Sequence, residues 1–161
     1  MCPSGDNKWD REAMRQTFYL SNMCVQHSQL NQNTWEHLES TCRQWAKKFG
    51  GVYIVCGPIF STKPTKKIGG NLSVPNKFFK VVLCLKGKDG KPQAIGFIYD
   101  NVSPKKKDRL ESNAVSVDQV EKITGMDIPE CKFYAYTSES ILRYYDNRST
   151  FRKYRYRRIA S

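Results

Sequence analysis

Apolar side chains repeat every three or four residues between positions 35 and 49. Such steps place every member on one face of an α-helix. The members are Trp35, Leu38, Cys42, Trp45 and Phe49. Asn33 and Glu36 have the spacing of a capping box at the start, and Gly50-Gly51 marks the end. The pattern predicts an amphipathic helix that buries one face against another layer.

Apolar, β-branched runs after this helix predict the strands on which it packs. Residues 52–56 are expected to form a buried strand that Gly57-Pro58 ends. Residues 78–86 and 93–99 are expected to form a hairpin through Asp89-Gly90, a strong turn signal. Short helices are expected at residues 10–17 and 116–124, the second with Ser116 as its N-cap. An extended piece is expected at residues 19–22 and a long loop at residues 61–76.

Composition excludes several classes of protein. The 161 residues suffice for one domain with a core. The apolar share of 39% is too high for a fully disordered chain. The longest apolar runs are far shorter than the roughly 18 residues that cross a bilayer, so no membrane is expected as a partner. The N-terminus shows no secretory signal, and the localisation stays open.

The charge of the chain favours a polyanionic partner. Lys and Arg number 27 against 15 Asp and Glu, a net charge of +12, which suits nucleic acid. A basic soluble protein without such a partner has the same balance. In the tail, residues 127–161, cations alternate with aromatic rings. That pattern suits single-stranded nucleic acid but also describes a solvated, disordered tail.

Six cysteines are present, and none of them form a C-x-x-C pair, so no zinc site is expected. Cys42 lies on the apolar helical face, and Cys56 and Cys84 lie in predicted strands. We expect these three to be buried structural thiols.

Polar side chains share the main helix with its apolar face. Asn31, Trp35, Glu39 and Arg43 follow at intervals of four, so they form one slowly drifting stripe if the helix begins early enough. An amide oxygen and a carboxylate there suit a hydrated Mg²⁺, and a guanidinium suits phosphate. The same spacing describes an ordinary amphipathic helix in which Glu39 and Arg43 form an ion pair. The spacing alone leaves both interpretations open.

A larger set of residues at specific spacings surrounds this stripe. It comprises residues 1–9, 13–14, 17–22, 26, 30–33, 35, 38–39 and 43, then 57–59, 74–76, 78–81, 94–97, 115–118 and 124–125. With these residues the chain closely resembles the DNA/RNA non-specific endonuclease family over positions 1–126. The resemblance implies an α+β domain of the ββα-metal fold, an antiparallel sheet with flanking helices, followed by the tail at 127–161.

The resemblance also implies an activity, the Mg²⁺-dependent hydrolysis of phosphodiester bonds in DNA and RNA. Asn31 matches the sole protein ligand of one mostly water-coordinated Mg²⁺ ion. Glu39 matches the glutamate that orients water of the metal shell, and Arg43 the arginine that contacts the substrate phosphate. Asn22 matches an asparagine that supports the site. The residues expected to bind nucleic acid are Arg43, Lys66 and Lys67.

One part of the family pattern is missing. The family's general base is the histidine of a D-R-G-H motif, which the alignment places immediately before Met1. We therefore expect a fold that is incomplete at the N-terminus and an isolated chain with little or no activity. His27, in a loop, and His37, on another side of the helix, are not expected to replace that base.

Two other interpretations stay open. The chain could be a non-catalytic, basic nucleic-acid-binding module, whose affinity falls steeply with salt whether or not Mg²⁺ is present. Alternatively, it could act only after joining a separate N-terminal fragment. A homodimer is a further open arrangement.

Overall fold

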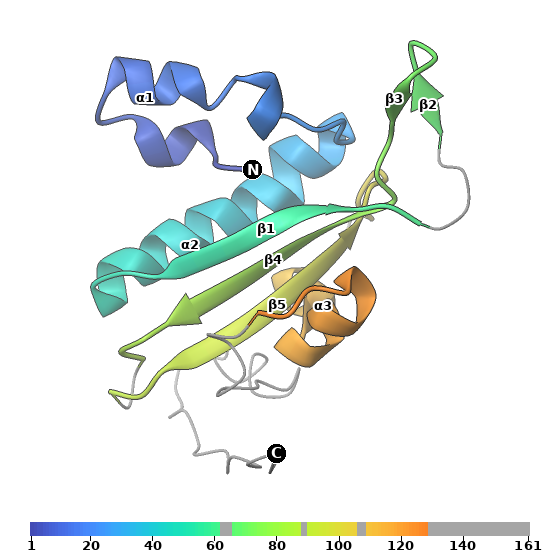
Figure 1. The fold of residues 1–161 in the computed structure, drawn as a ribbon. Coiled ribbons are helices and arrows are strands. Elements are labelled where there is room, and N and C mark those ends of the chain that lie inside the picture. Colours follow the sequence, from blue (N-terminus) through green and yellow to red (C-terminus); the bar gives the residue numbers. More distant parts are fainter. Residues whose placement is uncertain (62–65, 88–89, 106–108, 129–161) are drawn as a thin grey trace.

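The computed structural model of the chain describes residues 1–61, 66–87, 90–105 and 109–128. A four-stranded antiparallel sheet lies between two helices, α2 on one face and α3 on the other (Figure 1). The predicted α+β class with flanking helices is thereby confirmed. The tail at 127–161 falls almost wholly outside the described residues, as does Cys131. No helix in the described ranges is long and apolar enough to cross a membrane.

The sheet orders its strands β1-β4-β5-β6. The predicted hairpin is formed by β4 (Lys77–Cys84) and β5 (Gln93–Asp100). On either side of it lie β1 (Tyr53–Ile59) and the short β6 (Ala114–Val115), both antiparallel to their neighbours. Lys80, near the middle of β4, lies opposite Cys56 of β1 and Phe97 of β5. β4 is buried from Phe78 onward because it has a strand on each side and a helix on each face.

The strand β1 forms one edge of the sheet and is more exposed than predicted. Tyr53, Ile54 and Val55 are 57%, 37% and 43% exposed. The prediction of a strand is correct, but the prediction of its burial is wrong. Among the described residues, β1 pairs with β4 alone and therefore lies at an edge of the sheet. An apolar run in the sequence does not reveal whether a strand is central or at an edge.

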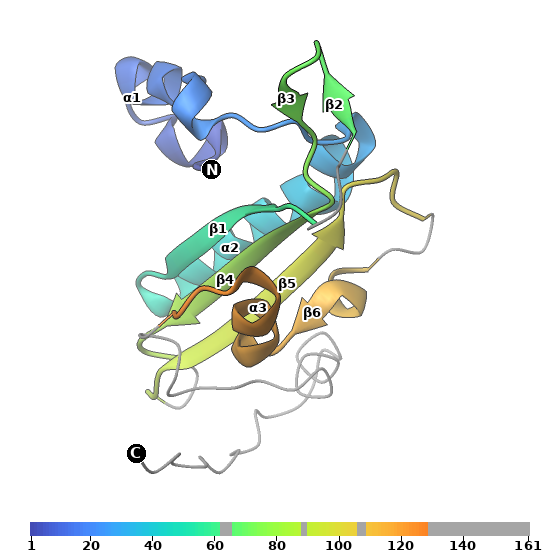
Figure 2. The ribbon, with the colours of Figure 1, turned by 45° about the vertical axis from the view of Figure 1, so that its right-hand side comes forward.

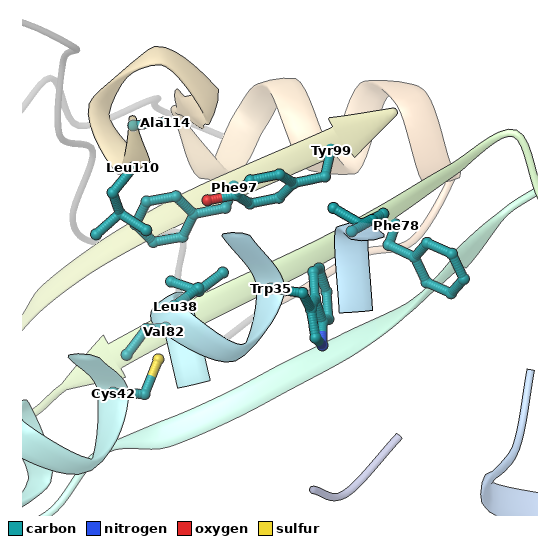
Figure 3. Packing of buried hydrophobic residues seen from close by; sticks show 10 residues of the cluster. Trp35, Leu38, Cys42, Phe78, Val82, Phe97, Tyr99, Leu110 and Ala114 are labelled. Atoms are coloured by element: carbon teal, nitrogen blue, oxygen red, sulfur yellow. The ribbon is translucent and has the colours of Figure 1, made fainter. Parts of the chain in front are cut away.

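Side chains alternate between the two faces of the sheet and build two apolar clusters. The cluster under α2 includes Trp35, Leu38, Cys42, Phe78, Val82, Phe97 and Tyr99 (Figure 3). The cluster under α3 includes Phe79, Val81, Leu83, Ala94, Val117 and Val120. In the first, the Trp35 ring meets Phe78 and Tyr99 edge-on, at centroid distances of 5.7 and 5.8 Å. The predicted apolar helix face thus packs as expected.

The helix α2 (Glu36–Phe49) ends as predicted, with Gly50 at φ 78°. Its start differs, because a π-helical segment, Leu30–Trp35, precedes it. The predicted capping box is wrong: Asn33 lies inside this segment, and its Nδ2 donates to Gln29 Oε1 at 2.9 Å. At α3 (Val117–Thr124), by contrast, Ser116 and Gln119 do form a capping box, and Gly125 follows the end.

The N-terminal residues fold into a short helical arm beside α2, seen in Figure 2. It contains 3-10 turns at Ser4–Asn7 and Leu20–Asn22 and helix α1 (Arg11–Gln16). The expectation of an extended piece at 19–22 is therefore wrong, because the chain turns there to bring Asn22 back to Cys2. Within the predicted loop at 61–76 there is a small hairpin, β2 (Lys67–Ile68) with β3 (Leu72–Ser73). A 3-10 turn, Leu110–Asn113, precedes β6.

Candidate functional site

The candidate site lies along one stripe of the main helix, and the π-helical segment sets its geometry. Residues 30–35 follow the wider π pattern of hydrogen bonding. Such a turn absorbs one extra residue, so the eight positions from Asn31 to Glu39 count as seven α-helical steps of about 100°. The two side chains then lie about 20° apart round the axis, instead of about 80° in an uninterrupted α-helix. The π turn thus reduces the drift of the stripe and turns Asn31 and Glu39 toward nearly the same direction.

Exposure varies along this stripe, from the buried Trp35 to the exposed Asn31. Trp35 is 2% exposed, and the side chains of Glu39 and Arg43 are 16% and 32% exposed. Asn31 is exposed, and its backbone N–H donates to His27 O at 2.9 Å. No described residue hydrogen-bonds to the Asn31 side-chain amide. Its oxygen is therefore accessible to water and to a hard cation such as Mg²⁺.

Glu39 is a half-buried carboxylate beside a fully buried lysine. Lys80 Nζ lies 3.6 Å from Glu39 Oε1 and 4.6 Å from the centre of the Trp35 ring. Burial raises the pKa of Glu39, and Lys80 together with a side-chain hydrogen bond to Trp35 opposes that rise. The charge of Asp6 raises the pKa of Glu39 and the charge of Arg43 lowers it, so both residues lie close enough to act on the Glu39 carboxylate.

Arg43 binds carboxylates that the spacing did not identify. Its Nη1 lies 3.0 Å from Asp6 Oδ1, and its Nη2 lies 3.4 Å from Glu36 Oε1. The Glu39–Arg43 ion pair of an ordinary amphipathic helix is not formed. Glu39 instead pairs with Lys80 of β4. The N-terminal turn packs directly on the guanidinium: a Cβ on Gly5 would lie 3.0 Å from Arg43 Nη1.

Asn22 ties the N-terminal residues to the arm. Its Oδ1 accepts from Cys2 N at 2.7 Å, and its Nδ2 donates to Cys2 O and Thr17 O, both at 2.8 Å. Cys56 of β1 adds a second tie through a hydrogen bond from its Sγ to Met1 O at 3.1 Å. These contacts fix the first residues beside α2, near Asp6 and Arg43.

Three residues at the site were missed by sequence reasoning: Lys80, Asp6 and Asn101. Asn101 holds the segment that leads into the π turn, since its Oδ1 accepts from His27 N at 2.7 Å and its Nδ2 donates to Val25 O at 3.1 Å. It also donates to Pro75 O at 2.9 Å. For Lys80 there was a signal, because a lysine inside an apolar strand must find a partner. Asp6 and Asn101 are so distant in sequence from their partners that no local pattern indicates these contacts.

The predicted nucleic-acid-binding lysines lie at the Asn31 end of the stripe, away from Glu39 and Arg43. Lys66 and Lys67 are exposed at the start of the β2–β3 hairpin. Both views place this hairpin at the end of the sheet where the main helix begins, the end that carries Asn31 (Figures 1 and 2). The structure therefore groups Glu39, Arg43 and Asp6, and sets the lysines near the opposite end of the stripe.

The available donor atoms fit a hydrated hard cation. In the described part of the chain no three His, Cys, Asp or Glu side chains form a metal-binding group. What the stripe offers is an exposed amide oxygen and a carboxylate, which suits an ion that keeps most of its water. His27 is engaged at the start of the helix, where its Nδ1 accepts from Gln29 N at 3.3 Å. His37 is exposed, about 200° round the axis from Glu39.

The described cysteines are free, and burial makes Cys42, on the main helix, inert. Cys42 and Cys84 are buried as predicted, whereas Cys56 is half-buried. Burial raises the pKa of Cys42 to about 12. A thiol with that pKa stays protonated at neutral pH and is neither a nucleophile nor a metal ligand.

Comparison with known proteins yields consistent matches. The sequence model of the DNA/RNA non-specific endonuclease family matches residues 1–133. Nuclease 1, mitochondrial, from Schizosaccharomyces pombe is 35% identical over 140 residues, covering 78% of this chain and 44% of that protein. Nuclease C1 from Cunninghamella echinulata is 38% identical over 138 residues, covering 78% of this chain and 54% of that protein. The chain thus spans about half the length of the curated relatives it matches.

The fold is also similar to a solved structure, the crystal structure of the EndoG/EndoGI complex. The TM-score is 0.72 at 24% sequence identity, with 80% of this chain and 56% of that chain covered. At this level of identity the match establishes the architecture, which is that of the ββα-metal nucleases.

Proposed function

The chain belongs to the DNA/RNA non-specific endonuclease family, and from this premise we propose that it supplies the helix-borne part of a nuclease site for DNA and RNA. Members of this family are metal-dependent nucleases. The observation that supports the proposal is the π turn at Leu30–Trp35, because ideal helix geometry then turns Asn31, Glu39 and Arg43 toward one side of the main helix.

The three polar residues of the stripe have roles that their surroundings support. Asn31 would hold one Mg²⁺ ion through its amide oxygen. Glu39 would hold water in the shell of that ion. Arg43 would bind a phosphate after substrate displaces the carboxylates of Asp6 and Glu36. When bound, Mg²⁺ stabilises negative charge on the phosphate.

Two further groups would position the nucleic acid and the chain itself. Lys66 and Lys67 are exposed on a hairpin beside the start of the helix, where they would contact the phosphate backbone. Asn22 would act indirectly, through its hydrogen bonds to Cys2. In the family, the general base directly precedes the position of Met1. The ties from Asn22 and Cys56 would therefore hold such a base beside the stripe.

Plasmid cleavage tests this function. We would incubate supercoiled plasmid with the chain alone, and with the same chain preceded by a segment that ends in Asp-Arg-Gly-His. The extended chain is expected to nick the plasmid in Mg²⁺ and not in EDTA. The chain alone should be slower by about 10²–10⁴, the typical contribution of a general base. A folded, extended chain that does not nick, or that nicks equally well in EDTA, contradicts the proposal.

Matched variants connect the activity to the stripe. Asn31→Ala should abolish cleavage by the extended chain. Asn33→Ala is the control, because Asn33 is exposed in the same π turn and binds Gln29. RNA and DNA substrates should respond alike. If instead the chain binds DNA without cleaving it, with an affinity that falls with salt and ignores Mg²⁺, a binding module is the better description.

A further inference from the structure

Lys80 is a buried cation directly beneath the candidate site. Its side chain is 1% exposed. It lies on the central strand β4, between Cys56 and Phe97 of the neighbouring strands, on the face covered by α2. A lysine in such a place is costly unless a charge compensates it. The groups that compensate it therefore indicate what the residue does.

Both partners of Lys80 belong to the main helix and lie four residues apart. The ammonium is 3.6 Å from Glu39 Oε1 and 4.6 Å from the centre of the Trp35 ring. It therefore contacts the carboxylate and the aromatic ring together. Trp35 is further fixed by edge-on contacts with Phe78 and Tyr99. Lys80 thus joins a rigid aromatic cluster to the carboxylate on the exposed stripe.

The surroundings of Glu39 show why such a contact matters. Asp6 repels its charge, while Arg43 is engaged by Asp6 and Glu36. Burial disfavours the ionised form of Glu39, and the largest influence that opposes burial is the charge of Lys80. Without this lysine, the buried side of Glu39 would face an apolar cluster.

We propose that Lys80 is a positioning residue of the nuclease site, which holds the Glu39 carboxylate in line with Asn31 and Arg43 from inside the sheet. The inference rests on the proposed function, because it gives Glu39 the task of ordering water around the metal ion. Lys80 itself touches neither metal nor substrate. Residues that orient the groups around a metal ion commonly change its affinity by about 10–100-fold when they are removed.

The test is a cycle of variants in the 161-residue chain: Lys80→Met, Glu39→Gln and the double variant. Mg²⁺ is titrated while NMR follows the Asn31 side-chain amide, which Asn31→Ala identifies. Lys80→Met should weaken the apparent Mg²⁺ affinity by about tenfold. In the Glu39→Gln background the same change should have an effect of less than about twofold, because the group it positions is already absent. A merely structural lysine would lower the affinity equally in both backgrounds, and that result overturns the proposal.

The indole N–H resonance of Trp35, identified by Trp35→Phe, gives a readout that needs no metal. It should move in Lys80→Met and stay near its original position in Lys80→Arg, which keeps the cation. Should Lys80→Met fail to fold, Lys80→Arg remains informative. It is expected to lose less Mg²⁺ affinity than the loss of about tenfold expected for Lys80→Met, because it keeps a cation beside Glu39. A loss of about tenfold or more would contradict a role that depends on charge. Lys77→Met is the matched control, since Lys77 is on the same strand but pairs with Asp100 at the surface.

Failure of this inference is distinguishable from failure of the proposed function. If the Asn31 amide of the original chain does not respond to Mg²⁺, the metal site is refuted, and the role of Lys80 falls with it. If the amide responds but Lys80→Met changes neither the affinity nor the Trp35 resonance, only the inference about Lys80 is wrong.

Discussion

The two faces of one sheet differ in what they bury, and β4 shows the difference within a single strand. Its side chains toward α3, Phe79, Val81 and Leu83, meet an apolar layer. Those toward α2 include Lys80 between Phe78 and Val82. Replacing a buried ion pair with apolar residues often leaves stability unchanged or raises it. The α3 face is therefore expected to supply stability, whereas the α2 face gives up some stability to place charge under the site.

The largest effect should come from a cavity on the α3 face. Phe79→Ala removes a ring that is 1% exposed and should lower the free energy of unfolding by about 3–5 kcal/mol. Urea denaturation measures the loss. Leu72→Ala, in the exposed hairpin, is the control and should change it by less than about 0.5 kcal/mol. A small loss at Phe79 would contradict this difference between the faces, since the α3 face would then contribute little to stability.

Overpacking of the same face should cost less. A Cβ on Gly96 would lie 2.7 Å from Val120 Cγ2, so Gly96→Ala should lower the free energy of unfolding by about 1–3 kcal/mol. Val120→Ala removes the clashing atom. The double variant should therefore lose less than the sum of the two single losses, again measured in urea. Strict additivity would mean that α3 packs less tightly on β5 than the structure indicates.

A pH effect should sharpen the description of the α2 face. Burial raises the pKa of Glu39 above its usual 4.5. Between pH 4.5 and this raised pKa, Glu39 therefore keeps its proton in the folded chain but has lost it in the unfolded chain. The contribution of Glu39 to stability is then largest below pH 4.5 and falls as pH rises through the raised pKa. Glu39→Gln should remove this part of the pH dependence. The comparison needs urea titrations of both chains between about pH 4 and 7; parallel curves would mean that Glu39 ionises as it does in water.

The smallest effect concerns the thiols. With the pKa of Cys42 raised to about 12, iodoacetamide at about pH 8 should modify exposed Cys2 and leave Cys42 intact, as mass spectrometry of peptides can show. In urea both should react. Rapid labelling of Cys42 in the folded chain would indicate that water enters the apolar cluster under α2, which contradicts the burial of this residue.

Local signals in the sequence predicted much of this fold. The 3.6-residue period of α2, its end at Gly50, the N-cap at Ser116 and the β4–β5 hairpin all depend on residues close together in the chain. Two of the predictions that failed, the burial of β1 and the extended piece at 19–22, depend on distant partners. The capping box at Asn33 failed for a local reason, because the π-helical segment begins before it. Whether β1 lies at an edge is decided by which strands lie beside it, and a short apolar run carries no such information.

The site shows the same division. The spacing placed Asn31, Glu39 and Arg43 on one helix, and the family resemblance gave them roles that remain proposals. Neither the spacing nor the resemblance could show that Arg43 binds Asp6, 37 residues away, or that Glu39 forms an ion pair with Lys80. The π turn was also missed, because its extra residue interrupts the periodicity by which helices are found.

That π turn changes how the site should be searched for in other sequences. Since it absorbs one residue, Asn31 and Glu39 are eight positions apart in the chain but are oriented as if they were seven apart. A chain with one residue fewer and a regular α-helix would present the same two groups in the same direction. A deletion in residues 32–34 that relaxes the π turn should thus be tolerated at the site. A search pattern with a fixed gap would overlook such a chain, whereas one that allows both lengths would find it.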